Sequence, residues 1–325
     1  MATVPTINDI ETAAKRIGSY VHRTPVLTSR AINRMCDAAL YFKCENFQRV
    51  GAFKIRGATN AVFSLRDDEA CTGVATHSSG NHAAALALAA RWKGIHAHVV
   101  MPDNAPRVKI DAVRGYGAEI VFCEPTLEAR EATLAEVVAK TGATVIHPYN
   151  DLRVIAGQGT ATLELISDVA DLEAILAPVG GGGLLSGTAI AAAALSPRTR
   201  VFGCEPEGAD DARRSFESGS WVPSVSPDTI ADGLLTSLGD LTFPIILRHV
   251  AGIITVDDEG IAHAMRLVWE RMKIVIEPSA AVPLAALMKH RSAVRGRRVG
   301  ILLSGGNVEL DRLPWVVESF AKAED

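Results

Sequence analysis

The chain has 325 residues, with 33 basic and 37 acidic side chains and a net charge of −4. Apolar residues make up 48% and charged residues 22%, a balance that is typical of a packed globular protein and excludes a disordered chain. The mild acidity argues against a nucleic-acid-binding protein, which normally needs a basic face, and the length allows one large domain or two modest ones.

The N-terminal segment carries Asp9 and Glu11 where a signal peptide would have its apolar core. Further along, no apolar run approaches the roughly 20 residues that span a bilayer. The five cysteines are odd in number and widely spaced, and no CxxC pair occurs. The cysteine pattern therefore predicts reduced, mostly buried thiols and a cytoplasmic location. The apolar runs and the charge balance predict that neither a membrane nor a nucleic acid is a partner.

Short apolar runs alternate along the chain with amphipathic, Ala-rich stretches. Because most of the runs are apolar on successive residues, they resemble strands that are covered on both faces. Strands are predicted at Gly73–His77, His96–Met101, Glu119–Cys123, Thr144–His147, Ala174–Val179, Arg200–Cys204, Gly252–Val256 and Arg298–Leu303. Helices are predicted at Asn81–Trp92, Arg107–Tyr116, Thr126–Lys140, Gly157–Ser167, Leu184–Leu195, Glu259–Met272 and Ala280–Lys289. This alternation predicts an α/β fold with mainly parallel sheets. The irregular stretch Gly208–Ser237 is predicted to be a surface loop.

The first candidate for chemistry is Lys54, in the apolar, glycine-flanked segment Val50–Ala61. In such a setting the pKa of a lysine can fall far enough for amine chemistry. The alternative is a solvated surface charge, as most lysines are.

Polar loops follow three of the predicted strands. His77-Ser78-Ser79-Gly80-Asn81-His82 opens a predicted helix, where its side chains could cap the helix or its N–H groups could hold a carboxylate. Ser304-Gly305-Gly306-Asn307 ends the last strand. Since ligands of open α/β sheets bind at the carboxyl ends of strands, these loops and Lys54 predict one shared cleft.

Four consecutive glycines, Gly180–Gly183, lie between a predicted strand and a predicted helix. Backbone N–H groups can converge on a phosphate there, and a Cβ atom would block their approach. The alternative is a tight structural turn. Glu205 and the turn up to Asp211 form an oxygen-rich stretch that suits Mg²⁺ or Ca²⁺, or else a solvated acidic turn.

Together, the order of these motifs resembles the fold-type II pyridoxal-phosphate enzymes, and most closely the family of serine racemases and threonine/serine dehydratases. The resemblance runs from His22-Arg23-Thr24-Pro25 through Ile155–Thr160 to Asn307. It implies a tryptophan synthase β-like α/β fold with two open, twisted, mainly parallel sheets that carry helices on both faces. A smaller domain at residues 73–150 would be inserted between residues 1–72 and 151–325 of the larger one.

The family's roles carry over to the matching positions. Lys54 would form the Schiff base with pyridoxal phosphate and move protons at the substrate α-carbon, with Ser79 serving the opposite face. The cofactor would be held by Phe53 and Gly233 at its ring, Asn81 at its 3-oxygen, Ser304 at its ring nitrogen, and Gly180, Gly181, Gly182 and Gly183 at its phosphate. The substrate carboxylate would be received by Ser78, Ser79, Asn81, His82 and Arg130. A divalent cation, Mg²⁺ with Ca²⁺ or Mn²⁺ as alternatives, would be held by Glu205, the Ala209 carbonyl and Asp211.

The resemblance implies an ammonia-lyase that converts a β-hydroxy amino acid to an oxo acid and ammonia, with 3-hydroxyaspartate, threonine and serine as candidate substrates. Ser79 favours an alternative, a serine or aspartate racemase with side dehydratase activity, because threonine dehydratases commonly carry alanine there. A non-catalytic sensor of a phosphorylated metabolite is a rival of another class. Lys54 argues against the sensor, because phosphate binding alone does not need a lysine in that setting.

Four positions depart from the family pattern. Val50 and Ala52 replace hydroxyl-bearing residues, and Ala83 and Ala84 replace the Gly and Gln of the racemase. Because that Gln contacts a nucleotide effector, activation by ATP is not expected, although Tyr116 matches. The chain ends soon after Asn307, so no C-terminal regulatory domain is expected, and the family implies a homodimer.

Overall fold

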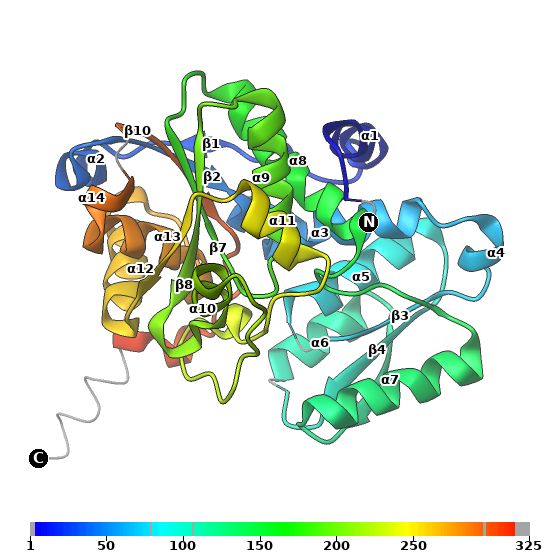
Figure 1. Ribbon diagram of the computed structural model, residues 1–325. Coiled ribbons are helices and arrows are strands. Elements are labelled where there is room, and N and C mark those ends of the chain that lie inside the picture. Colours follow the sequence, from blue (N-terminus) through cyan, green and yellow to red (C-terminus); the bar gives the residue numbers. More distant parts are fainter. Residues whose placement is uncertain (1–3, 79, 106, 295–296, 316–325) are drawn as a thin grey trace, which may run out of the picture.

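The computed structural model describes residues 4–78, 80–105, 107–294 and 297–315, and its strands form two sheets (Figure 1). The first has six strands in the order β1-β2-β10-β7-β8-β9, namely β1 Val26–Leu27, β2 Ala39–Cys44, β10 Arg298–Leu303, β7 Ala174–Pro178, β8 Arg200–Pro206 and β9 Gly252–Val256. The second has four in the order β5-β4-β3-β6, namely β5 Glu119–Cys123, β4 Ala97–Pro102, β3 Val74–His77 and β6 Thr144–Val145. Strand β1 pairs antiparallel with β2, and the other recorded strand pairs are parallel.

Helices cover both faces of each sheet, because the strands are apolar on both sides. One face of the six-stranded sheet packs against α2 (Arg30–Cys36), α12 (Asp258–Met272) and α13 (Pro278–Lys289), and the other against α8 (Leu152–Asp168), α9 (Gly183–Leu195), α10 (Asp211–Ser218) and α11 (Thr242–His249). The four-stranded sheet lies between α3 (Lys54–Phe63), α5 (Asn81–Lys93) and α6 (Arg107–Gly115) on one side and α7 (Leu127–Thr141) on the other. Helix α1 (Ile7–Ile17) packs on α8, and α4 (Asp67–Ala70) and α14 (Arg291–Val294) are short.

The predicted α/β fold with mainly parallel sheets is confirmed, and its eight predicted strands are all present. Strand β6 ends at Val145, two residues before its predicted end at His147. Strands β1 and β2 were not predicted. Strand β2 is held by parallel pairing with β10, whose partner residues lie more than 250 positions away in the sequence, so local pattern carries little signal for it. The four-stranded sheet occupies residues 74–145, while the limits of the two domains stay a prediction.

The prediction that Gly208–Ser237 is a loop is wrong in part, because α10 lies inside it. The Glu205 carboxylate accepts hydrogen bonds from the backbone N–H groups of Ala212 and Arg213, both at 2.9 Å. The first turn of α10 is therefore capped by a side chain that precedes the stretch. Helix α8 likewise begins five residues before its predicted start at Gly157, where Asp151 caps it through the N–H groups of Arg153 and Val154.

All five cysteines are free thiols, and Cys36, Cys44 and Cys204 are buried. Across the described ranges, no helix combines the length and apolar character needed to cross a membrane.

Candidate active site

The lysine segment and the last polar loop lie side by side. The Phe53 N–H donates to the Ser304 carbonyl at 3.0 Å, and Ala52 forms a β-bridge with Gly305. Helix α3 begins at Lys54 immediately afterwards, so the amine leaves the helix at its N-terminal end. Two sequence motifs that are 250 residues apart therefore meet at the carboxyl end of β10.

The Lys54 amine is partly buried and has defined partners. Its Nζ donates to the Pro148 carbonyl at 2.9 Å and lies 5.3 Å from the centroid of the Phe53 ring. Burial lowers the pKa of Lys54 to about 8, against the opposing effect of the Glu277 carboxylate. The reading of Lys54 as a solvated surface charge is therefore wrong, and its amine deprotonates more readily than that of an ordinary lysine.

The described residues of the loop after β3 give the start of α5 no side-chain cap. Its N-cap residue is Gly80, which has no side chain, and the Ser78 hydroxyl accepts from the Gly80 N–H at 3.3 Å. The alternative that this loop caps the helix finds no support among its described side chains. Uncapped N–H groups at a helix start suit a carboxylate. Ser79, predicted in both the catalytic and the substrate-binding set, lies outside the described residues.

His82, the second residue of α5, is buried. Its side chain is 2% exposed, Nε2 contacts the Ile146 carbonyl at 3.1 Å, and Nδ1 has no hydrogen-bond partner among the residues described. Burial lowers the pKa of His82 to about 3, and the Lys54 charge adds to this, so the ring is neutral at pH 7. Arg130 is partly buried and donates through Nε to the Thr126 carbonyl at 3.2 Å. The pKa of the His77 ring is lowered mainly by burial and further by the nearby charge of Arg130.

The tetraglycine loop connects β7 to α9, and its glycines are required by close packing. A Cβ on Gly181 would lie 2.3 Å from the Tyr149 ring, and Gly182 has a φ of 87°. The alternative of a tight structural turn is thus correct as far as packing goes. The first backbone bond of the helix runs from the Ser186 N–H to the Gly182 carbonyl at 2.8 Å, so the N–H groups just before it face outward from the helix end. The loop can therefore also bind an anion.

The segment that contains Gly233 lies against the tetraglycine loop. A Cβ on Gly180 would lie 3.0 Å from the Cα of Leu234, and the Gly233 N–H donates to the Ser279 hydroxyl at 3.0 Å. Gly233 and the tetraglycine loop are therefore neighbours, as the resemblance implies.

Glu277 was not singled out in the sequence, yet it lies at the junction of these loops. It is the N-cap residue of α13, and its carboxylate is 4% exposed. It accepts from the Asn81 amide at 3.1 and 3.2 Å and from the Asn307 N–H at 3.1 Å. The signal that could have found it is an acidic residue directly before a proline in an otherwise apolar, buried stretch.

The predicted cation site contains two buried carboxylates. Glu205 and Asp211 are each 1% exposed, and neither Asp211 oxygen has a well-formed hydrogen bond among the described residues, although the Ser224 hydroxyl lies near enough to moderate the rise in the Asp211 pKa. Burial raises the pKa of Glu205 to about 9 and that of Asp211 to about 6. The structure groups no three His, Cys, Asp or Glu side chains in a metal-binding cluster within the described ranges, so the third ligand would have to be a carbonyl such as that of buried Ala209. Orphaned carboxylate oxygens fit a hard cation.

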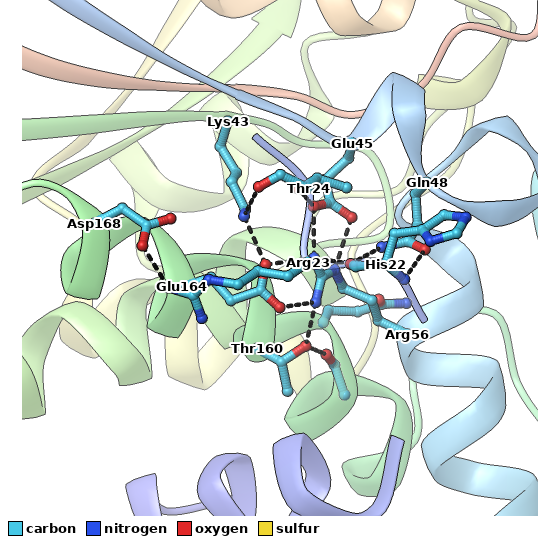
Figure 2. A network of polar contacts seen from close by, with 12 residues as sticks. His22, Arg23, Thr24, Lys43, Glu45, Gln48, Arg56, Thr160, Glu164 and Asp168 are labelled. Carbon is cyan, nitrogen blue, oxygen red and sulfur yellow. Dashed lines mark hydrogen bonds and ion pairs between the residues drawn. The ribbon is translucent and has the colours of Figure 1, made fainter. Parts of the chain in front are cut away.

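A second buried cluster, which we call the Arg56 network, centres on Arg56 in the first turn of α3 (Figure 2). The Arg56 guanidinium binds Glu45 at 2.7 and 2.8 Å and Glu164 at 2.8 and 2.9 Å. Lys43 also donates to Glu164, at 2.6 Å. Two motifs of the resemblance, His22-Arg23-Thr24-Pro25 and Ile155–Thr160, contribute to this network. Thr24 donates to Glu45 at 2.6 Å, and Thr160 accepts from Arg56 at 3.2 Å. These motifs therefore anchor the scaffold of the site.

The observed residues fit pyridoxal phosphate. The site offers a lysine amine of lowered pKa, a glycine cradle that any Cβ would fill at the start of a buried helix, and the 3% exposed Ser304 held beside Phe53. These are the donor types needed for an aldehyde, a phosphate and an aromatic ring, respectively.

The model of the family "pyridoxal-phosphate dependent enzyme" matches residues 17–305 of this chain. A β-hydroxyaspartate dehydratase of Paracoccus denitrificans is 53% identical over 312 residues, covering 96% of this chain and 99% of that protein. An L-threo-3-hydroxyaspartate ammonia-lyase of Saccharomyces cerevisiae is 48% identical over 310 residues, covering 95% of each chain of the pair. The crystal structure of the serine racemase from Dictyostelium discoideum superposes with a TM-score of 0.91 at 52% identity, covering 95% of this chain and all of that one. The family and fold implied by the motifs are confirmed.

Proposed function

Because the chain belongs to the pyridoxal-phosphate-dependent enzyme family, we propose that it is an ammonia-lyase that converts β-hydroxy amino acids to the oxo acid and ammonia. The observation that carries this proposal is the Lys54 amine, whose pKa is lowered to about 8 where the polar loops meet. Candidate substrates are 3-hydroxyaspartate first, then threonine and serine, and two of the relatives above are named for hydroxyaspartate chemistry.

The cofactor would be held by residues in the loops and helix starts next to both sheets. Lys54 would bond to it covalently, the N–H groups of Gly180–Gly183 would bind its phosphate, and Phe53 and Gly233 would lie at its ring, with Asn81 at the 3-oxygen and Ser304 at the ring nitrogen. When bound, pyridoxal phosphate supplies an electron sink for the charge that develops at the substrate α-carbon. The Ser304 hydroxyl is neutral, so it would not hold the ring nitrogen protonated as an aspartate would, and this weaker electron withdrawal favours elimination.

The chain's own residues would bind the substrate and move its protons. Ser78, Asn81 and His82 would receive the substrate carboxylate at the uncapped start of α5, with Arg130 and Ser79 completing that set. The Lys54 amine, once displaced by the substrate, would take the proton from the α-carbon. Its lowered pKa suits this task, because a general base works best when its pKa lies near the working pH.

A serine or aspartate racemase with side elimination is the second candidate. It is favoured by Ser79, the one residue that the resemblance places on the face of the α-carbon opposite Lys54, and by the likeness to a serine racemase. A non-catalytic sensor is disfavoured, because binding a phosphate does not need the Lys54 amine at this point. A divalent cation at Glu205, Ala209 and Asp211, a homodimer and a cytoplasmic location also belong to the proposal.

The test is oxo acid release from L- and D-serine, L-threonine and each 3-hydroxyaspartate stereoisomer, with racemisation measured in parallel. We expect elimination to be fastest with one hydroxyaspartate isomer. Ser79→Ala should lower racemisation by about a hundredfold to ten-thousandfold, the usual contribution of a general acid or base, and leave elimination from L-substrates largely intact. Ser64→Ala, at the partly buried C-cap of α3, is the matched control. No oxo acid from any of these substrates would refute the ammonia-lyase, and unchanged racemisation in Ser79→Ala would refute the role of Ser79.

A further inference from the structure

A buried carboxylate lies between the start of α5 and the loop after β10, and no described residue forms an ion pair with it. Glu277 lies 4% exposed at the start of α13, and its hydrogen-bond donors are the neutral Asn81 amide and the neutral Asn307 N–H. Burying a carboxylate without an ion pair lowers the stability of the fold. A carboxylate kept in such a place is therefore a candidate for a functional role. Burial raises the pKa of Glu277 to about 7, with a further contribution from Asp232.

Asn307 extends this contact to the lysine loop. Its side-chain amide donates to the Val50 carbonyl at 2.7 Å and to the Asn81 side-chain oxygen at 2.8 Å. The amide and the carboxylate therefore hold the start of α5, next to the four-stranded sheet, against the loop that precedes Lys54. Val50 has a φ of 56°, which is rare for a β-branched residue and shows that the contact over-determines the backbone there.

Gly305, two residues before Asn307, is needed for this contact. A Cβ on Gly305 would lie 2.7 Å from a Glu277 carboxylate oxygen. The Glu277 N–H also donates to the Gly305 carbonyl at 3.0 Å. The loop after β10 is thus shaped around the carboxylate, and any residue other than glycine at 305 would push it away.

Three charged groups face Glu277. Lys54 interacts with it electrostatically, and its own pKa is raised by the carboxylate. Asp232 and Lys109 are the other two, and they form an ion pair with each other at 2.7 Å across the two sheets. Glu277 is therefore the carboxylate of the described site whose charge raises the pKa of Lys54.

We propose that Glu277 is a positioning residue of the reaction, whose carboxylate fixes the Asn81 amide and the Asn307 loop around the Lys54 amine. The inference rests on the proposed function only in taking Asn81 and Lys54 as site residues. An amide nitrogen has two N–H groups, so the one that does not face Glu277 is held ready for a ligand oxygen. Ionised Glu277 accepts all the donors present, whereas the protonated acid would direct a hydrogen at the Asn81 nitrogen or the Asn307 N–H.

The principal variant is Glu277→Gln, which keeps the shape and removes the charge. A single amide oxygen cannot replace both carboxylate oxygens, so Asn81 and Asn307 would compete for it. We expect pyridoxal phosphate to bind about 10- to 100-fold more weakly by equilibrium dialysis, the range for losing a hydrogen bond to a charged group. We expect kcat to fall by a similar factor, with a smaller change in KM.

Two readouts separate positioning from a merely structural role. In the wild-type enzyme, kcat/KM should fall as pH drops through about 7, where Glu277 takes up a proton, and Glu277→Gln should lack this acid limb. In the cofactor-free full-length chain, the pH at which an amine-reactive reagent labels half of Lys54 should shift downward in the variant, because the carboxylate that raises the lysine pKa is gone. Glu277→Asp keeps the charge and should retain the acid limb.

The matched control is Glu270→Gln, on the exposed face of α12, where Glu270 pairs with Arg266 at 2.8 Å. It should leave the cofactor affinity, the acid limb and the Lys54 labelling unchanged. Should Glu277→Gln fail to fold, Asn307→Ala removes the contacts to Asn81 and Val50 without removing a charge. That variant should weaken cofactor binding and keep the acid limb.

Unchanged cofactor affinity and an unchanged acid limb in Glu277→Gln would overturn the proposal, even if the variant melted at a lower temperature. Strong cofactor binding in Asn307→Ala would overturn it as well. If the wild-type enzyme turned over no hydroxy amino acid, the proposed function would fail by itself, because cofactor affinity and Lys54 labelling do not depend on a substrate.

Discussion

Helix α3 contributes Lys54 and Arg56 to two clusters of charge that behave in opposite ways. In the Arg56 network, burial would raise the pKa of Glu45, but the Arg56 guanidinium outweighs this and holds it below its usual value. Burial alone would lower the pKa of Arg56, which its two carboxylate partners raise instead. Around Lys54 and Glu277 burial prevails, so the pKa of the lysine falls to about 8 and that of the acid rises to about 7.

The difference follows from pairing. Every Arg56 contact is a charge-assisted hydrogen bond of 2.7 to 3.3 Å, so the charged forms are the stable ones and the network holds the scaffold. Lys54 and Glu277 have neutral hydrogen-bond partners, the Pro148 carbonyl on one side and two amides on the other. Their charged forms are destabilised, and groups in that condition exchange protons near neutral pH.

Removing the lysine should have the largest effect. Lys54→Ala is expected to abolish turnover and the visible absorption of the bound cofactor, because no other described amine replaces the one that bonds to it. Absorption spectra and the oxo acid assay check this. Lys93→Ala, whose amine caps carbonyls at the end of α3, is the control. Retained absorption at the same wavelength would contradict the assignment of Lys54.

Breaking the Arg56 network should be costly in stability. Arg56→Met leaves buried Glu45 without its cationic partner and leaves partly buried Glu164 with Lys43 alone, so the free energy of unfolding should fall by about 3–5 kcal/mol. Urea denaturation followed by circular dichroism measures it. The control is Arg66→Met, whose ion pair with Asp68 is fully exposed, and it should cause no resolvable change. Equal stability of Arg56→Met and the wild type would show that the network is not structural.

The cation site extends the comparison to a third group of buried acids. If Mg²⁺ or Ca²⁺ pairs with Glu205 and Asp211, adding it at 100 times its Kd should stabilise the protein by about 2.7 kcal/mol, and EDTA should reverse this. Asp211→Ala should lose the response, while Asp228→Ala, on the exposed loop that follows, should keep it. Calorimetric melting with and without EDTA is the measurement. If EDTA changed neither the melting temperature nor the turnover rate, Glu205 and Asp211 would be unpaired acids rather than metal ligands.

The smallest effect is a shift along the pH axis. In the cofactor-free chain, Lys54 should react with an amine reagent half-maximally near pH 8, because its folded-state pKa lies below the usual 10.5. Lysine reactivity requires the neutral amine, so a lowered pKa moves labelling to lower pH. Lys43, which is fully buried and ion-paired with Glu164, should stay unlabelled until the protein unfolds. Mass spectrometry of the labelled peptides reports both, and equal labelling midpoints would erase the contrast between the clusters.

Local pattern was sufficient for the central strands and for the motif loops. Strands such as β7 and β10 are apolar on successive residues, and the loops that follow them bring Gly180–Gly183 and Ser304 to one edge of the sheet. It was insufficient for β2, which depends on pairing with β10, and for α10, whose cap comes from Glu205. Both elements are stabilised by partners that no short window of sequence contains.

The sequence by itself determined the kind of chemistry, because the residue types that a phosphate, an aldehyde and a carboxylate require stand in the family's order. Only the tertiary structure decided which charges are paired. Arg56 stands two residues after Lys54, yet one meets carboxylates and the other a carbonyl. Glu277 became a candidate only once Asn81, nearly 200 residues before it, was seen against it. The pKa of a side chain depends on burial and on neighbours within a few ångströms, and those are set by the fold rather than by adjacency along the chain.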